Sequence, residues 1–131
     1  MTTPYLIVTP ITTAFLALFI IPLAVKIIKL RWKHRVSLYD GGHKDLAQAV
    51  RAHGNFLEYV PICLLLLAFS EVNQAPVWSL YILAAILLLS RLFHAHGMLK
   101  INFKSRKIGM YLTLATLIGG SGLLISTLFT F

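Results

Sequence analysis

Apolar tracts long enough to cross a lipid bilayer dominate the sequence. Residues 1–25 and 108–131 carry no formal charge, and residues 72–90 form a third tract that is nearly as long. About 20 helical residues span a hydrocarbon core of about 30 Å, so each tract has roughly the length of one transmembrane helix. The chain is also 58% hydrophobic over its 131 residues, which is too apolar for a water-soluble domain of this size. The solvent of this protein is therefore lipid.

A fourth span is masked by polar residues. Residues 46–70 are apolar except for Arg51, His53, Asn55 and Glu58, so only their second half stands out in hydropathy. Because irregular chain and open sheets cannot face lipid, we interpret the whole segment as a helix. The sequence predicts an all-α membrane protein, a four-transmembrane-helix bundle in a single domain over residues 1–131, with helices at about 4–36, 45–71, 76–98 and 106–130.

The basic residues are distributed unevenly along this pattern. Twelve Lys and Arg residues stand against four Asp and Glu, a formal net charge of +8. Seven of the twelve lie around the first connection and five around the third, whereas residues 71–76, the second connection, hold none. The positive-inside rule then places all twelve at the cytoplasmic face and both termini on the other side, as expected for a bacterial inner membrane protein. Attraction to anionic lipid accounts for the charge, so nucleic acid is not an expected partner.

Small residues predict where helices end and where they pack. The first helix is expected to run past the membrane surface before Asp40-Gly41-Gly42 breaks it. Residues 119–122, Gly-Gly-Ser-Gly, offer a surface for close helix packing in the last span. We interpret Cys63 as a small buried hydrophobe. No metal-ligand spacing, phosphate loop or serine triad appears, so no metal is expected.

A stripe of polar residues follows one face of the predicted second helix. At 100° per residue its members fall within an arc of about 100°. The deepest carboxylate lies about 20 Å along the helix from Asp45, and charged groups at such depth normally face a bundle interior or a water-filled cavity. The stripe consists of Gln48, Arg51, Asn55, Glu58 and Tyr59.

Two interpretations of this stripe are open. In the first, Arg51 and Glu58 belong to a buried ion-pair network that holds helices together. In the second, they bind a ligand: about 10 Å of helix separates them, too far for i,i+4 pairing but well matched to a small zwitterion. We favour the ligand, because Arg binds a carboxylate bidentately and Glu accepts hydrogen bonds from an ammonium group.

Residues 51–61, RAHGNFLEYVP, resemble the second-helix signature of the membrane-associated proteins in eicosanoid and glutathione metabolism, the MAPEG family. The length, the four-helix layout and the basic first loop are similar too, and Arg91-Leu92 followed by Gly97 resembles the family's third-helix end. The resemblance, which is to small members related to microsomal glutathione transferases, implies a homotrimer. Its active sites would lie between neighbouring subunits, open to the cytoplasm, and bind glutathione as co-substrate and a hydrophobic electrophile from the bilayer.

The resemblance also implies roles for particular residues. Carried over by position, Arg51, Asn55, Glu58 and Tyr59 would line the glutathione site. Glu58 would take the γ-glutamyl ammonium, and Arg51 a carboxylate or backbone carbonyl. Arg31 would contribute from the cytoplasmic end of the first helix.

The implied chemistry is activation of the glutathione thiol. A thiol with a pKa of about 8.5 is mostly protonated at neutral pH, and a nearby guanidinium stabilises the thiolate. In better-known members the activating arginine stands at the start of the fourth helix, where Arg106 is the nearest candidate. Glutathione-conjugating members often carry aromatic hydroxyls on the third helix, where this chain has His94 and Met98, so imidazole would replace one hydrogen bond to the ligand.

Three functions follow from these patterns. The favoured one is a glutathione transferase, with peroxidase activity as an extension, acting on lipophilic electrophiles. The second is a non-catalytic family member that binds a lipid or amphiphile between subunits. The third is a small proton-coupled transporter in which Glu58 carries the proton, although the nearby Arg51 is hard to reconcile with a site for cationic drugs.

Overall fold

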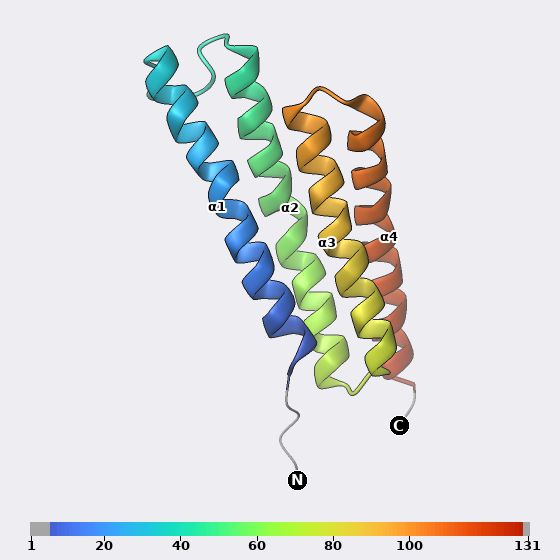
Figure 1. Cartoon of the computed structure of the whole chain (residues 1–131). Helices are drawn as coiled ribbons and strands as arrows, with labels where there is room; N and C mark the ends of the chain where they lie inside the picture. The colour runs from blue at the N-terminus through green and yellow to red at the C-terminus, as the bar shows by residue number, and fades with distance from the viewer. Residues whose placement is uncertain (1–5, 130–131) are drawn as a thin grey trace.

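The protein, described over residues 6–129 by a computed structural model, consists of four helices joined by short connections. In chain order they are α1 (Val8–His34), α2 (Lys44–Val72), α3 (Val77–Leu99) and α4 (Phe103–Thr127) (Figure 1). Each is long and apolar enough to cross a membrane, so the predicted all-α, four-span fold is present. Residues 4, 5 and 130, which the sequence assigned to helices, lie outside the described residues.

Local capping explains where the helix ends differ from the predicted ones. The first helix stops at His34, two residues early, because Arg35 adopts a left-handed conformation with φ of 54°. The fourth helix begins at Phe103, three residues early. There the side chain of Asn102 accepts a hydrogen bond from the backbone N–H of Ser105 at 3.1 Å and so caps the first turn.

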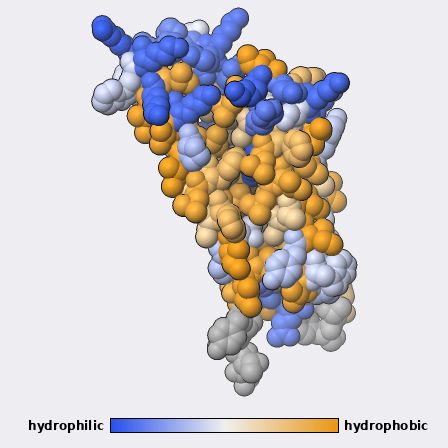
Figure 2. All heavy atoms as spheres, in the orientation of Figure 1, coloured by the Kyte–Doolittle hydropathy of each residue, from blue (hydrophilic) through white to orange (hydrophobic). Residues whose placement is uncertain are grey.

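The connections alternate between the two ends of the bundle. The α1–α2 and α3–α4 connections lie together at one end, and the α2–α3 turn lies at the other, with the start of α1 and the end of α4 (Figure 1). Hydrophilic residues crowd the end that holds the α1–α2 and α3–α4 connections, above an apolar body (Figure 2). This end is the cytoplasmic one by the positive-inside rule.

The tightest packing joins α3 to α4 at two glycines. A Cβ atom at Gly97 would collide with the backbone of Arg106, and one at Gly109 with the backbone of His94. The two helices therefore touch backbone to backbone over this stretch. In the predicted packing surface of residues 119–122, by contrast, Gly120 meets only an α2 side chain, at 3.3 Å from the added Cβ.

At the non-cytoplasmic end, a carboxylate of α2 fastens the start of α1. One oxygen of Glu71 accepts hydrogen bonds from the backbone N–H groups of Ile7 and Val8, both at 2.7 Å, and the other from that of Thr9 at 2.8 Å. First-turn N–H groups have no partner within their own helix, and the positive end of the helix dipole favours an anion. Glu71 thus caps α1 from a different helix.

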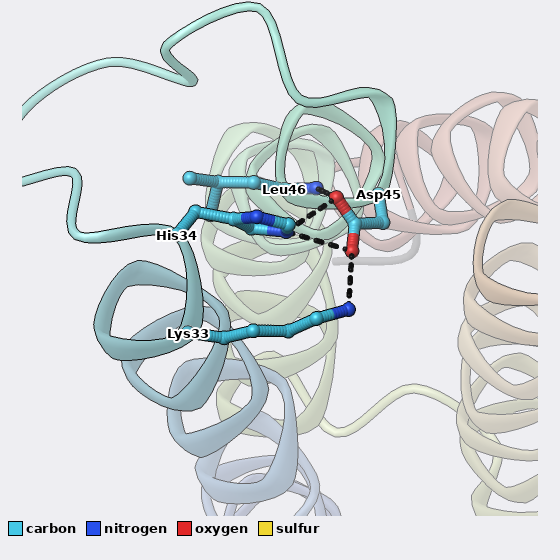
Figure 3. A network of polar contacts seen from close by, with 4 residues as sticks. All are labelled: Lys33, His34, Asp45 and Leu46. Carbon is cyan, nitrogen blue, oxygen red and sulfur yellow. Dashed lines mark hydrogen bonds and ion pairs between the residues drawn. The ribbon is translucent and has the colours of Figure 1, made fainter.

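At the cytoplasmic end, Asp45 at the start of α2 holds the end of α1 (Figure 3). Both of its oxygens lie 3.0 Å from Nε2 of His34, and one lies 3.7 Å from Nζ of Lys33. The same carboxylate accepts from the backbone N–H of Leu46. The ring of His34 stacks on that of His43, with centroids 3.8 Å apart. The α1–α2 hairpin is therefore pinned at both ends.

Between these ends, apolar side chains of α1, α2 and α3 form the core. Leu16, Phe56, Val60 and Leu87 are buried together there, and Cys63 is buried among them with 1% of its surface exposed. The outer face of α1 stays apolar and exposed, as expected for a surface that meets lipid or another subunit.

Candidate functional site

The two charges of the polar stripe contact each other directly. Nη1 of Arg51 lies 3.3 Å from Oε1 of Glu58, across two turns of α2. The sequence analysis treated Arg51 and Glu58 as too far apart along the helix to pair, but their side chains are long enough to reach each other. Their side chains are 65% and 51% exposed in the single chain, so this is no buried network. Both charges are accessible to a ligand or to a neighbouring subunit.

Asn55, from the same stripe, faces the bundle interior instead. Only 8% of its surface is exposed, and its Oδ1 accepts a hydrogen bond at 3.0 Å from Nη1 of Arg91 on α3. The periodicity placed Asn55 beside Arg51, but α3 packs over the interior edge of the stripe and covers it. Because Oδ1 is taken, the amide NH₂ is the part of Asn55 free to turn toward a ligand.

Arg91 is an intramembrane cation, which corrects the prediction that all basic residues lie at the membrane face. It is 2% exposed and stands eight residues before Leu99, about 12 Å below the end of α3. Nε donates to Oγ of Ser90 at 3.0 Å, Nη1 to Asn55, and Nη2 to Oγ1 of Thr113 on α4. Three oxygens from three helices compensate the buried guanidinium, and no carboxylate among residues 6–129 pairs with it.

At the cytoplasmic end, Arg106 comes close to the polar stripe. Arg106 in the first turn of α4 and Gln48 in the second turn of α2 line one hollow of about 100 Å³, together with Gly97 and Met98 of α3. The close contact at Gly97 brings the start of α4 to this position. The structure therefore gathers the predicted activating arginine and the predicted binding stripe on one side of the bundle.

His94 is buried one turn beyond Arg91 on α3. It is 6% exposed, and its backbone lies against Gly109, three residues after Arg106 on α4. Within residues 6–129, Glu58 is the one ion-pair partner of these three arginines, Arg51, Arg91 and Arg106, so the region has an excess of positive charge. Such a region suits an anionic ligand or an anion formed during a reaction.

The remaining predicted residues differ in how they are placed. Tyr59 is half-buried on α2, one residue after Glu58. Arg31 points elsewhere: its Nη1 donates to the backbone carbonyls of Ser37 and Tyr39, at 3.1 and 3.0 Å. In the isolated chain Arg31 thus orders the α1–α2 connection and does not join the cluster.

Sequence reasoning missed the role of Arg91, and a signal for it was present. An arginine that follows fourteen apolar or small residues of one helix lies well inside the span, unlike lysines in a loop. Its buried hydroxyl partners, Ser90 and Thr113, gave no signal, since both residues are common in membrane helices. Within residues 6–129, no cluster of His, Cys, Asp and Glu could hold a metal ion.

Comparisons with known proteins agree with this architecture. The profile of the MAPEG family matches residues 9–126. The chain is 37% identical over 102 residues to the inner membrane protein YecN of Escherichia coli K12, a match that covers 78% of each chain. The YecN protein of E. coli O6:H1 matches to the same extent. No solved structure matches the chain.

Proposed function

This chain belongs to the MAPEG family, and we propose that it is a membrane-embedded glutathione transferase acting on lipophilic electrophiles, with hydroperoxides as further substrates. Four spans and the similarity to an inner membrane protein make it a multi-pass protein of the inner membrane. The observation that carries the proposal is the set of arginines on three neighbouring helices: Arg51 pairs with Glu58 on α2, Arg91 of α3 donates to Asn55 of α2, and Arg106 of α4 lies against Gly97 of α3.

The ion pair on α2 supports the choice of a zwitterionic co-substrate. In the free chain Arg51 and Glu58 satisfy each other, and glutathione would replace this contact with two of its own. Its γ-glutamyl ammonium would bind Glu58, and one of its carboxylates would bind Arg51. Opening an exposed ion pair costs less than about 1 kcal/mol, which is small beside the about 1.5–3 kcal/mol that each hydrogen bond to a charged group contributes.

Arg106 is the proposed activating residue. Its guanidinium would stabilise the glutathione thiolate, whose proton leaves to water at the cytoplasmic end. The sulfur then attacks the electrophilic carbon, a C–S bond forms, and the leaving group departs with its electron pair. A hydrophobic electrophile would reach the sulfur from the bilayer. Asn55, Tyr59 and His94 would line the co-substrate site.

We propose a homotrimer on the basis of the family. In the single chain, Arg51 and Glu58 remain more than half exposed although they stand seven and fourteen residues into a membrane-spanning helix. A neighbouring subunit would cover them and turn an open face into a site between subunits. Arg31 of that neighbour would then stand near the rim.

The test is glutathione binding and conjugation by the purified protein in detergent. Calorimetric titration with millimolar glutathione should give saturable binding, and a model aryl halide should be conjugated. Arg51→Ala and Glu58→Ala should each weaken binding by about tenfold or more, the effect of losing one charged hydrogen bond. Lys29→Ala, at an exposed position of α1, serves as the matched control and should bind normally.

The outcomes separate the candidate functions. Absence of both binding and conjugation would exclude the transferase. Glutathione-independent retention of a lipid without conjugation would favour the non-catalytic family member. Proton-coupled uptake into liposomes that Glu58→Gln abolishes would favour a transporter, although the ion pair with Arg51 disfavours a proton-carrying role for Glu58.

A further inference from the structure

The outer surface of α3 carries a hollow that the glutathione chemistry does not use. It has a volume of about 590 Å³ and lies between α3 and α4. Its wall is made of apolar side chains, whereas its cytoplasmic rim is polar. The wall includes Leu89, Leu92, Phe93 and Ile108, and the rim includes His96 and Lys104.

A second hollow adjoins the first, about one turn of α3 closer to the membrane centre. It has a volume of about 270 Å³, lies between α1 and α3, and is lined by Phe15, Phe19, Leu88 and, at its inner side, Arg91. Leu92 lines both hollows, so they adjoin at this side chain, and we call the pair of hollows the trough. Measured along α3 from its end at Leu99, the trough runs from about 5 Å deep at His96 to about 16 Å deep at Leu88.

The charge around the trough is entirely positive. The α3–α4 hairpin, residues 77–127, contains five Lys and Arg residues and no Asp or Glu. Lys104 is exposed on the rim, and Lys100 and Lys107 are exposed nearby in the chain. No ion pair within residues 6–129 involves this hairpin, so its cations have no internal counter-charge.

We propose that the trough binds an anionic phospholipid of the cytoplasmic leaflet. The lipid phosphate lies at Lys104 and His96, and one acyl chain descends past Leu92 into the trough. An apolar channel that opens on a cationic rim at head-group depth complements such a lipid in both shape and charge. This proposal does not depend on the glutathione chemistry.

A second copy of the chain complements the trough less well. Each copy has four carboxylates. Asp45, Glu58 and Glu71 already have partners in their own chain, and Asp40 accepts a hydrogen bond from the backbone N–H of Gly42. Among these four, Asp40 and Glu71 are outside the ion pairs of residues 6–129, and Glu71 caps α1 at the opposite end of the bundle. A neighbouring subunit therefore brings little unpaired negative charge to the rim, whereas every anionic lipid brings a phosphate.

The experiment is native mass spectrometry of the full chain with equal amounts of phosphatidylglycerol and phosphatidylcholine. Wild type should retain phosphatidylglycerol at least about fivefold better, the factor expected from one cationic side chain near an anionic surface. Lys104→Gln should lower this preference by about fivefold. Lys29→Gln is the matched control, an exposed lysine on α1 outside the trough, and should leave it unchanged.

A second variant tests the trough itself. Leu92 is 53% exposed, so Leu92→Trp can fill the trough without disturbing the core. It should reduce retention of phosphatidylglycerol and leave the number of subunits in the same spectrum unchanged. Equal retention of the two lipids by wild type, or equal behaviour of the two lysine variants, would overturn the proposal. So would a Leu92→Trp protein with altered subunit number and normal phosphatidylglycerol retention, since the trough would then hold another subunit.

Discussion

Replacing Arg91 by methionine probes the polar junction between α2, α3 and α4. Three oxygens accept hydrogen bonds from its guanidinium, but they depend on it unequally. The hydroxyls of Ser90 and Thr113 donate to the backbone carbonyls of Leu87 and Gly109, at 2.7 and 2.8 Å, and keep these bonds in the variant. Only Oδ1 of Asn55, the buried asparagine on α2, loses its partner.

The expected cost of Arg91→Met is therefore that of one stranded acceptor. The three oxygens already compensate the desolvation of the guanidinium, and a buried polar group without a partner costs about 1–3 kcal/mol. The free energy of unfolding, measured by SDS titration in mixed micelles, should fall by that amount. Lys29→Met, at an exposed position, should change it by less than about 0.5 kcal/mol.

A double substitution decides whether this reasoning is right. Adding Asn55→Leu to Arg91→Met removes the stranded amide, and replacing both partners by apolar groups is close to neutral. The double variant should therefore unfold at higher SDS than Arg91→Met alone. If it is as unstable as Arg91→Met, or less stable, the junction does not act through this pair and the explanation is wrong.

Two further predictions concern helix ends and helix contacts. Glu71→Gln should weaken the cap of α1 by about 1 kcal/mol and speed amide hydrogen exchange in the first turn of α1, while exchange in α4 stays the same. Unchanged exchange in the first turn of α1 would contradict the capping role. Gly109→Ala should leave little folded protein on size-exclusion chromatography, because the added Cβ collides with the backbone of His94. The control Gly122→Ala has open space around the added Cβ and should fold normally. Equal yields of the two variants would contradict the backbone contact.

Three of the four spans were predictable from length and apolarity, and the second was predictable because irregular chain cannot face lipid. Helix ends were less so, since a left-handed Arg35 and a capping Asn102 are local choices that hydropathy does not detect. The polar stripe on α2 was predictable from its helical period. The structure buries some of its residues and leaves others exposed. Arg51 and Asn55 are about 40° apart on the helix, and only the position of α3 decides that one is exposed and the other covered.

Charge counting failed at Arg91 for a related reason. The positive-inside rule counts basic residues by their distance along the chain from a loop, and it cannot register that oxygens of three helices meet around one of them. The α3–α4 contact that brings Arg106 to the stripe was also hidden. It depends on Gly97 and Gly109, which contact Arg106 and His94 on the opposite helix. Neither glycine belongs to a cluster of small residues that would have predicted the contact.

The cap that Glu71 places on α1 also orders the steps of biosynthesis. Its carboxylate is made 62 to 64 residues after the backbone N–H groups that it accepts. Until Glu71 is made, the first turn of α1 lacks this partner, and its N–H groups need water or lipid head groups, which are found at the membrane surface. The turn becomes satisfied once α2 has crossed the bilayer and brings its far end alongside. The first two helices therefore mature as a pair, and a chain interrupted before Glu71 would leave α1 anchored but undocked.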